Sequence, residues 1–176
     1  MCYSVFCNYP TLIIVDTVNQ PRHLLRLNVG FIIGQPIGYS RDFDFDFPLL
    51  HLPPDLDLYE FKGTARVGRT QQGLILQAKF NCTIKTECVR CLTETIVALQ
   101  TEFDELYAFT VRSVSESGLI LPEDGHIDLE PLIREYLTLE IPIQPLCKPD
   151  CKGLCVECGE NLNERLCEHQ TKQPGI

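Results

Sequence analysis

Residues 74–103 read LILQAKFNCTIKTECVRCLTETIVALQTEF, and they predict a β-hairpin with a pair of cysteines at its tip. Apolar and polar residues alternate from the start of this stretch to Thr86, as in a strand that buries one face. A second strand pattern covers residues 93–109, so Cys88-Val-Arg-Cys91 connects the two strands. Two cysteines at this spacing in a tight turn can direct their sulfurs at one metal ion.

Two earlier segments are predicted to extend the same sheet. RDFDFDF, residues 41–47, alternates strictly and places three phenylalanines on one face and three aspartates on the other. We expect the phenylalanines to pack in the core, because the aspartates would repel phosphate from an aromatic surface that stacks bases. DLDLYEFKGTARVG, residues 55–68, predicts a further strand.

Helices are expected at two places. Residues 28–33, NVGFII, form a candidate short helix. A clearer helix has Asp128 as its predicted N-cap and ends before Pro142. Its apolar positions repeat at helical spacing: Leu129, Leu132, Ile133, Tyr136 and Leu137. The fold class predicted from these elements is α+β, with an antiparallel β-sheet or a partly closed barrel, one or two packed helices and a zinc-stapled C-terminal tail.

The size and composition are those of one globular domain with an appended tail. The chain has 176 residues, 44% of them hydrophobic and 22% charged, and no apolar run approaches the length of a membrane span. We expect a loosely ordered extension over residues 1–24, an α+β core domain over residues 25–146, and a cysteine-rich, zinc-binding tail over residues 147–176 that closes on the 88–91 tip.

The cysteines indicate metal binding in a reducing compartment. The first residues resemble neither a secretory signal nor a transit peptide, so a cytoplasmic location is expected. In the cytoplasm, ten cysteines are more readily explained by metal binding or redox chemistry than by structural disulfides. The net charge of −9 disfavours a protein that coats nucleic acid by electrostatics alone.

Eight candidate ligands make two complete sets of four for tetrahedral zinc. The tail sequence CKPDCKGLCVECGENLNERLCEH, residues 147–169, adds five cysteines and a histidine to the hairpin pair. The preferred division forms one site from Cys88, Cys91, Cys147 and Cys151, and the other from Cys155, Cys158, Cys167 and His169. A competing division joins the two Cys-x2-Cys pairs in one site, as zinc ribbons do, and leaves the other four candidate ligands to a second ion or to none. The expected number of zinc ions is therefore one or two.

The sequence resembles the YceD-like family of bacterial and plastid proteins, which is named for accumulation of large-subunit ribosomal RNA. The similar motifs run from Leu27 to Cys167: LNV…IIGQPIGYSRDF, ECVRCL, FDELY, IDLEPLIREYLTLEIPIQPLC and CKGLCVECGENLN. The resemblance implies a non-enzymatic factor with structural zinc. Many members end in Cys-x-Cys where this chain has Cys167-Glu-His169, which replaces a thiolate with an imidazole.

We therefore expect a non-enzymatic factor for processing or accumulation of large-subunit ribosomal RNA in ribosome biogenesis. Its expected partners are a ribosomal RNA precursor or a ribosome-assembly protein, with no membrane and no small-molecule substrate. Basic residues lie between the cysteines and could reach phosphates: Arg90, Lys148, Lys152 and Arg165. The alternatives are a zinc-dependent thiol redox sensor and a protein-interaction adaptor unrelated to ribosomes.

Overall fold

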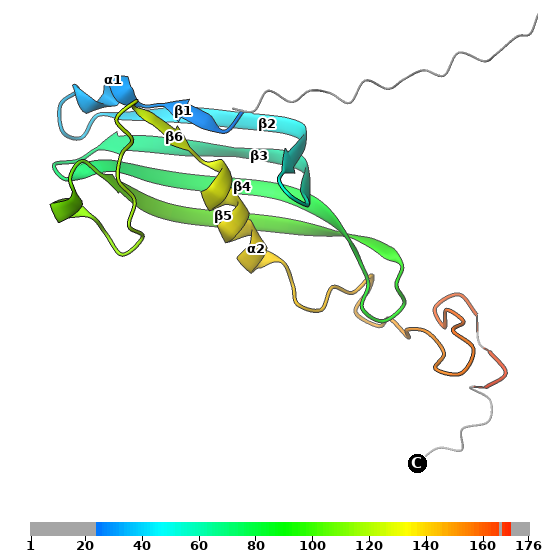
Figure 1. Ribbon diagram of the computed structural model, residues 1–176. Helices are drawn as coiled ribbons and strands as arrows, with labels where there is room; N and C mark the ends of the chain where they lie inside the picture. Colours follow the sequence, from blue (N-terminus) through cyan, green and yellow to red (C-terminus); the bar gives the residue numbers. More distant parts are fainter. Residues whose placement is uncertain (1–23, 166, 170–176) are drawn as a thin grey trace, which may run out of the picture.

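A computed structural model describes residues 24–165 and 167–169 (Figure 1). The elements in chain order are β1 (Arg26–Asn28), α1 (Gly30–Ile33), β2 (Ser40–Leu52), β3 (Leu56–Arg69), β4 (Gly73–Glu87), β5 (Glu94–Ala108), the 3-10 turn η1 (Val111–Ser113), β6 (His126–Asp128) and α2 (Glu130–Glu140). Apart from Leu24, the predicted N-terminal extension lies outside the described residues. No helix of the described part is both long and apolar enough to cross a bilayer.

The main sheet is an open antiparallel meander. Its strand order is β2-β3-β4-β5, so β2 and β5 are its edges, and β1 pairs with β6 in a separate two-stranded sheet. The α+β prediction with an antiparallel sheet is confirmed, and the partly closed barrel considered beside it does not form. The β4–β5 register runs without a shift from Gly73↔Ala108 to Glu87↔Glu94, which carries the cysteine tip beyond the end of the sheet (Figure 1).

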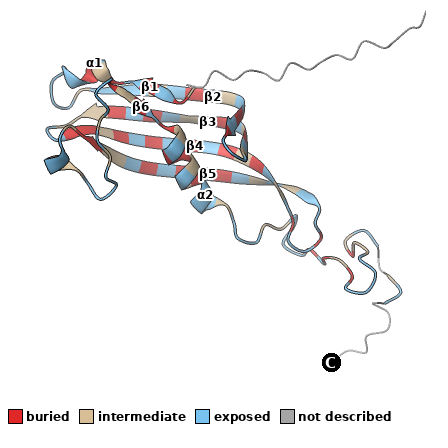
Figure 2. Cartoon of the chain, in the orientation of Figure 1, coloured by how far each residue is buried: buried red, intermediate tan, exposed pale blue. Residues whose placement is uncertain are grey.

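One face of the sheet holds the core. Buried and exposed residues alternate along the strands, as Figure 2 shows, and α2 lies across the covered face. A row of rings connects sheet to helix: the Phe61 and Phe80 centroids are 5.0 Å apart, and the Phe103 ring stacks on Tyr136 of α2 at 4.2 Å. The predicted packing of the RDFDFDF phenylalanines is confirmed, with Phe45 buried and its two neighbours half-buried against the core.

The other face is polar and carries cross-strand ion pairs. Acids on the edge strands meet cations on the inner strands, at directly opposed positions of the ladder in three pairs and diagonally in the fourth, Lys85–Glu94. The pairs are Arg66–Asp42 at 2.6 Å, Lys62–Asp46 at 3.5 Å, Lys79–Glu102 at 3.2 Å and Lys85–Glu94 at 3.6 Å. These exposed pairs contribute little stability, but they neutralise the cations that would otherwise attract nucleic acid to this face.

The start of α2 differs from the prediction by one residue. Asp128 belongs to β6, and the helical N-cap is Leu129, whose side chain makes no capping bond. The Asp128 carboxylate nevertheless accepts the N–H of Glu130 at 3.0 Å, so the aspartate still satisfies an N-terminal amide. The short strands β1 and β6 were not predicted, because three residues are too few to show a strand period.

Removing the ring at the centre of the aromatic row should destabilise the fold. Phe80 is fully buried, so Phe80→Ala should lower the free energy of unfolding by about 3–5 kcal/mol in urea titrations. Leu139→Ala, on the exposed side of α2, is the control and should change it by no more than about 0.5 kcal/mol. Similar losses in the two variants would contradict the placement of the core.

Candidate metal centres

The first group of candidate ligands joins the hairpin tip to the chain beyond α2. We call Cys88, Cys91, Cys147 and Cys151 the hairpin cluster. Its four sulfur atoms all lie within 4.8 Å of one another. The β4–β5 turn supplies the first two, and the extended segment after α2 supplies the others. The cysteines thereby bring together parts of the chain that are more than fifty residues apart in sequence.

The sulfur separations fit metal coordination and exclude disulfides. Cys88 Sγ lies 3.7 Å from Cys151 Sγ, and Cys91 Sγ lies 3.5 Å from Cys147 Sγ. A disulfide requires about 2.05 Å, whereas thiolates about 2.3 Å from a tetrahedral ion lie about 3.8 Å apart. The cysteines of the described residues are all free thiols.

Backbone hydrogen bonds hold the tail against the tip. Val89 N–H donates to the Pro145 carbonyl, and Leu154 N–H donates to the Arg90 carbonyl, each at 3.0 Å. Gly153 has a φ of +78°, and a Cβ there would lie 3.1 Å from the Arg90 carbonyl oxygen, so this close approach requires glycine. The Arg90 guanidinium also donates to the Cys151 carbonyl at 2.9 Å. Arg90, one of the basic residues considered for phosphate contacts, therefore helps to position the hairpin cluster.

The thiols of the hairpin cluster differ sharply in acidity. Burial opposes ionisation of Cys88, but nearby backbone N–H groups, including those of Cys147 and Cys91, lower its pKa to about 6. Cys147 is exposed as a residue, but desolvation of its sulfur and hydrogen bonds with the neighbouring thiols raise its pKa to about 12. The pKa of Cys91 is also lowered, chiefly by hydrogen bonds from Thr93. Ionisation of all four thiols would bring like charges together, so it requires a cation that offsets their repulsion.

The second group is local to the tail. We call Cys155, Cys158, Cys167 and His169 the tail cluster, and their ligand atoms also lie within 4.8 Å of one another. A tight turn positions the first pair: Gly159 N–H donates to the Cys155 carbonyl at 2.9 Å, and Cys155 N–H donates to the Glu160 carbonyl at 2.8 Å. Backbone N–H groups of Cys158 and Glu157 lower the pKa of Cys155 to about 7. This cluster is less enclosed, since only Cys155 is buried.

Asn163 links the two clusters, and sequence reasoning missed it. Its Nδ2 donates to Cys151 Sγ of the hairpin cluster at 3.3 Å, while its Oδ1 accepts the Lys152 N–H at 2.9 Å. It belongs to the loop between Cys158 and Cys167, so a loop that closes the tail cluster supplies a hydrogen bond to the hairpin cluster. The motif CGENLN contains this asparagine, but spacing gives no sign of a contact to a sulfur twelve residues away.

The structure groups the eight predicted ligands in the preferred division. The ribbon pairing, which would place Cys88 and Cys91 beside Cys155 and Cys158, is not the arrangement found. Cys82 lies apart from both clusters as a buried residue of β4, and burial raises the pKa of its thiol to about 11. The two clusters could each hold a metal ion.

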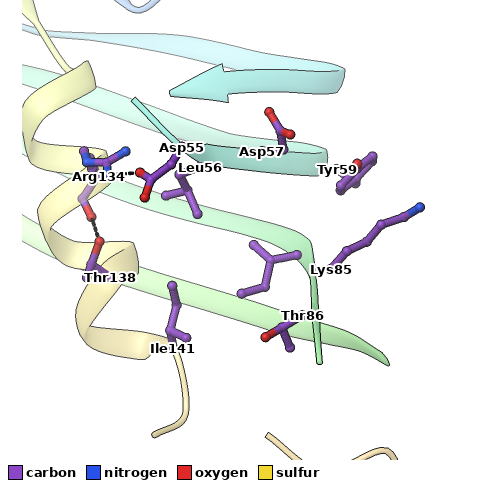
Figure 3. Close-up of a pocket in the computed structure, with 10 residues that line it drawn as sticks. Asp55, Leu56, Asp57, Tyr59, Lys85, Thr86, Arg134, Thr138 and Ile141 are labelled. Carbon is purple, nitrogen blue, oxygen red and sulfur yellow. Dashed lines mark hydrogen bonds and ion pairs between the residues drawn. The ribbon is translucent and has the colours of Figure 1, made fainter. Parts of the chain in front are cut away.

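A cavity of about 370 Å³ lies between α2 and the β3–β4 strands (Figure 3). Several of its polar side chains form ion pairs or hydrogen bonds. Arg134 forms an ion pair with Asp55, and the Thr138 hydroxyl donates to the Arg134 carbonyl at 2.6 Å. The Lys85 ammonium lies 5.3 Å from the centroid of the Tyr59 ring. The Arg134–Asp55 ion pair joins α2 to the turn between β2 and β3 at the edge of this cavity.

Comparison with known proteins gives one family and several partial relatives. The family described as Large ribosomal RNA subunit accumulation protein YceD matches residues 76–175, more than half of the chain and all eight candidate ligands. An uncharacterized protein of Mycobacterium leprae is 33% identical over 114 residues, which are 62% of this chain and 49% of the relative. An uncharacterized protein of Mycobacterium tuberculosis strain H37Rv is 34% identical over 112 residues, which are 61% of this chain and 51% of the relative.

Plant relatives match over a shorter stretch. Large ribosomal RNA subunit accumulation protein YCED homolog 1, chloroplastic, of Arabidopsis thaliana is 47% identical over 47 residues, which are 27% of this chain and 15% of the relative. The chain spans about half the length of the mycobacterial relatives it matches. No solved structure was found to match it.

Asn163→Leu should weaken metal retention although Asn163 is not a candidate ligand. The substitution keeps the approximate volume and removes the hydrogen bonds to Cys151 and Lys152, and loss of such supporting bonds typically costs about 10–100-fold in metal affinity. Titration of metal-loaded protein with a competing chelator measures the effect. Asn81→Leu, on the polar face of the sheet, is the matched control. Equal retention in the two variants would contradict the supporting role.

Proposed function

The chain belongs to the YceD family, and from this we propose that it is a non-enzymatic factor for processing or accumulation of large-subunit ribosomal RNA during ribosome assembly. The observation that carries the proposal is the pair of four-ligand clusters, all of whose members lie in the region that matches the family. We propose that each cluster holds one structural zinc ion, and that the protein acts in the cytoplasm, where its thiols stay reduced.

The chemistry of the donors favours zinc. Sets of four cysteines, or of three cysteines with one histidine, are the usual ligands of tetrahedral structural zinc. The spacings do not follow those of ferredoxin iron–sulfur sites. Zinc would neutralise the repulsion among the thiolates and stabilise a tail whose packing consists mainly of the cysteines themselves, with Leu146 and Leu154 half-buried beside them.

The absence of catalysis is also proposed, and two features support it. A zinc ion with four protein ligands has no open position for water, whereas catalytic zinc keeps one. Arg134, Asp55 and Thr138, beside the cavity at α2, are already engaged in an ion pair and a hydrogen bond. We therefore infer that the clusters shape a surface that binds a ribosomal RNA precursor or an assembly protein.

The charge distribution favours the cysteine end of the molecule for the proposed RNA contact. The polar face of the sheet pairs its cations with acids, and the chain as a whole carries a net charge of −9. At the cysteine end, Lys148 and Lys152 are exposed. Arg165 is held by Glu160 through two hydrogen bonds of 2.6 and 2.9 Å. The two lysines are therefore the cations best placed to reach phosphate.

Deletion of the gene in its host should lower large-subunit ribosomal RNA relative to small-subunit RNA and cause precursor to accumulate. Northern analysis and ribosome profiles on sucrose gradients measure both effects. A wild-type copy should restore the ratio, whereas Cys88→Ser should fail, because it breaks the link between hairpin and tail. Cys82→Ala, which removes a cysteine outside both clusters, should restore it. An unchanged ratio after deletion would contradict the proposed function.

A further inference from the structure

The β5 edge of the sheet is long and differs from the β2 edge. It extends over fifteen residues, Glu94–Ala108. On the opposite edge, Pro48 interrupts β2 and three aspartates lie along the strand, which are features that discourage pairing with another chain. The central part of β5, residues 95–101, reads TIVALQT and contains no charge, proline or glycine. Such a segment readily accepts an additional strand.

The backbone of β5 reveals which groups face outward. Ala108 directs its N–H to the Leu119 carbonyl at 3.0 Å and accepts the Leu121 N–H at 2.9 Å, so both of its polar groups point away from β4. The direction alternates along an antiparallel strand, and the register with β4 has no shift. The N–H and C=O groups of Ala98 and Gln100 therefore also point outward. Within the described residues, no backbone hydrogen bond from another segment reaches the 95–101 stretch.

The side chains of β5 indicate which kind of strand could pair with its free edge. β5 carries acidic residues and no lysine or arginine. Glu94 and Glu102 flank the uncharged centre, and although Lys85 and Lys79 pair with them, their side chains stay 68% and 69% exposed. Antiparallel pairing of two copies about Ala98 would set Glu94 opposite Glu102 twice, and like charges at opposed positions are destabilising. A second copy is therefore disfavoured.

A hollow of about 600 Å³ reaches this edge on the polar face, where Ala98, Leu99 and Gln100 form part of its lining. Ile96, on the same face, is 67% exposed. Side chains of an added strand that point to the polar face could therefore pack against Ile96 and enter the hollow. The outward hydrogen-bonding groups and the acidic flanks lie along β5, and the hollow, which β3 and β4 also line, borders them.

We propose that β5 binds an extended, basic segment of a partner protein, which adds to the sheet as a fifth strand along residues 95–101. The segment has an uncharged, β-forming centre with lysine or arginine about eight residues apart, opposite Glu94 and Glu102. The main-chain hydrogen bonds supply affinity, and the charge pairs supply selectivity. This surface is separate from the metal clusters and goes beyond the proposed role in ribosomal RNA accumulation.

Two fluorescein-labelled peptides test the proposal directly: KTVTVTVTK, and the matched ETVTVTVTE. Fluorescence anisotropy with the metal-loaded, full-length protein should show at least tenfold tighter binding of the lysine peptide. Ala98→Pro removes one outward N–H and should weaken this binding at least tenfold, while proline is tolerated because that N–H faces away from β4. Ala98→Val is the control and should bind as the wild type does.

Charge reversal supplies an independent test. The double variant Glu94→Lys, Glu102→Lys should reverse the preference between the two peptides. Each variant should keep the wild-type metal content, so a failure here is distinguishable from a failure of the proposed function. Equal affinity for both peptides, or full binding by Ala98→Pro, would overturn the proposal. Dimerisation of the wild type that Ala98→Pro abolishes would also overturn it, because the occupant would then be a second copy.

Discussion

The constraint on which the structure depends is the convergence of four sulfurs at the end of the β4–β5 hairpin. Cys88 and Cys91 are fixed by a strand register that runs unbroken through the core, whereas Cys147 and Cys151 arrive on a segment with little core of its own. A short segment of this kind needs a metal or a disulfide to hold a unique fold. Sulfur separations of 3.5 and 3.7 Å exclude the disulfide. The tail is held to the hairpin tip by backbone hydrogen bonds and by packing of the cysteines, and the proposed zinc ion would fix it there.

The sheet positions the cysteine end of the molecule through the continuous β4–β5 ladder. Its covered face is held to α2 by the ring stack between Phe103 and Tyr136, and the Tyr136 hydroxyl donates to Glu105 at 2.6 Å, which raises the pKa of that tyrosine to about 12. The polar face pairs its charges across strands. The two proposed functions use different parts of the molecule. Metal binding and the ribosome-related contact are proposed for the cysteine end, and binding of a partner strand is proposed for the β5 edge.

Sequence patterns predicted the parts of the fold that repeat and missed those that depend on single contacts. Alternation located β4 and the start of β2, with the buried side of RDFDFDF, because burial of one face imposes a period of two. The positions of β3 and β5 were also predicted, from weaker strand patterns. Cysteine spacing suggested two sets of four, and the structure groups the side chains in the preferred way. Strands β1 and β6 are too short to show a period, and the open sheet could not be distinguished from a barrel because alternation is common to both. Asn163 was missed because its contact to Cys151 arises only after the tail folds back.

We propose two separate metal sites: one of four sulfurs, which holds the tail to the hairpin, and one of three sulfurs and a nitrogen, which closes the tail on itself. Zinc analysis of purified protein, combined with X-ray absorption at the zinc edge, tests this proposal most directly. We expect two zinc ions per chain with an average shell of 3.5 sulfurs and 0.5 nitrogens, from the seven cysteines and one histidine of the two clusters. Cys88→Ser and Cys155→Ser should each remove a different ion. One zinc per chain, an oxygen-rich shell, or loss of the same ion in both variants would rule out two separate sites with these ligands.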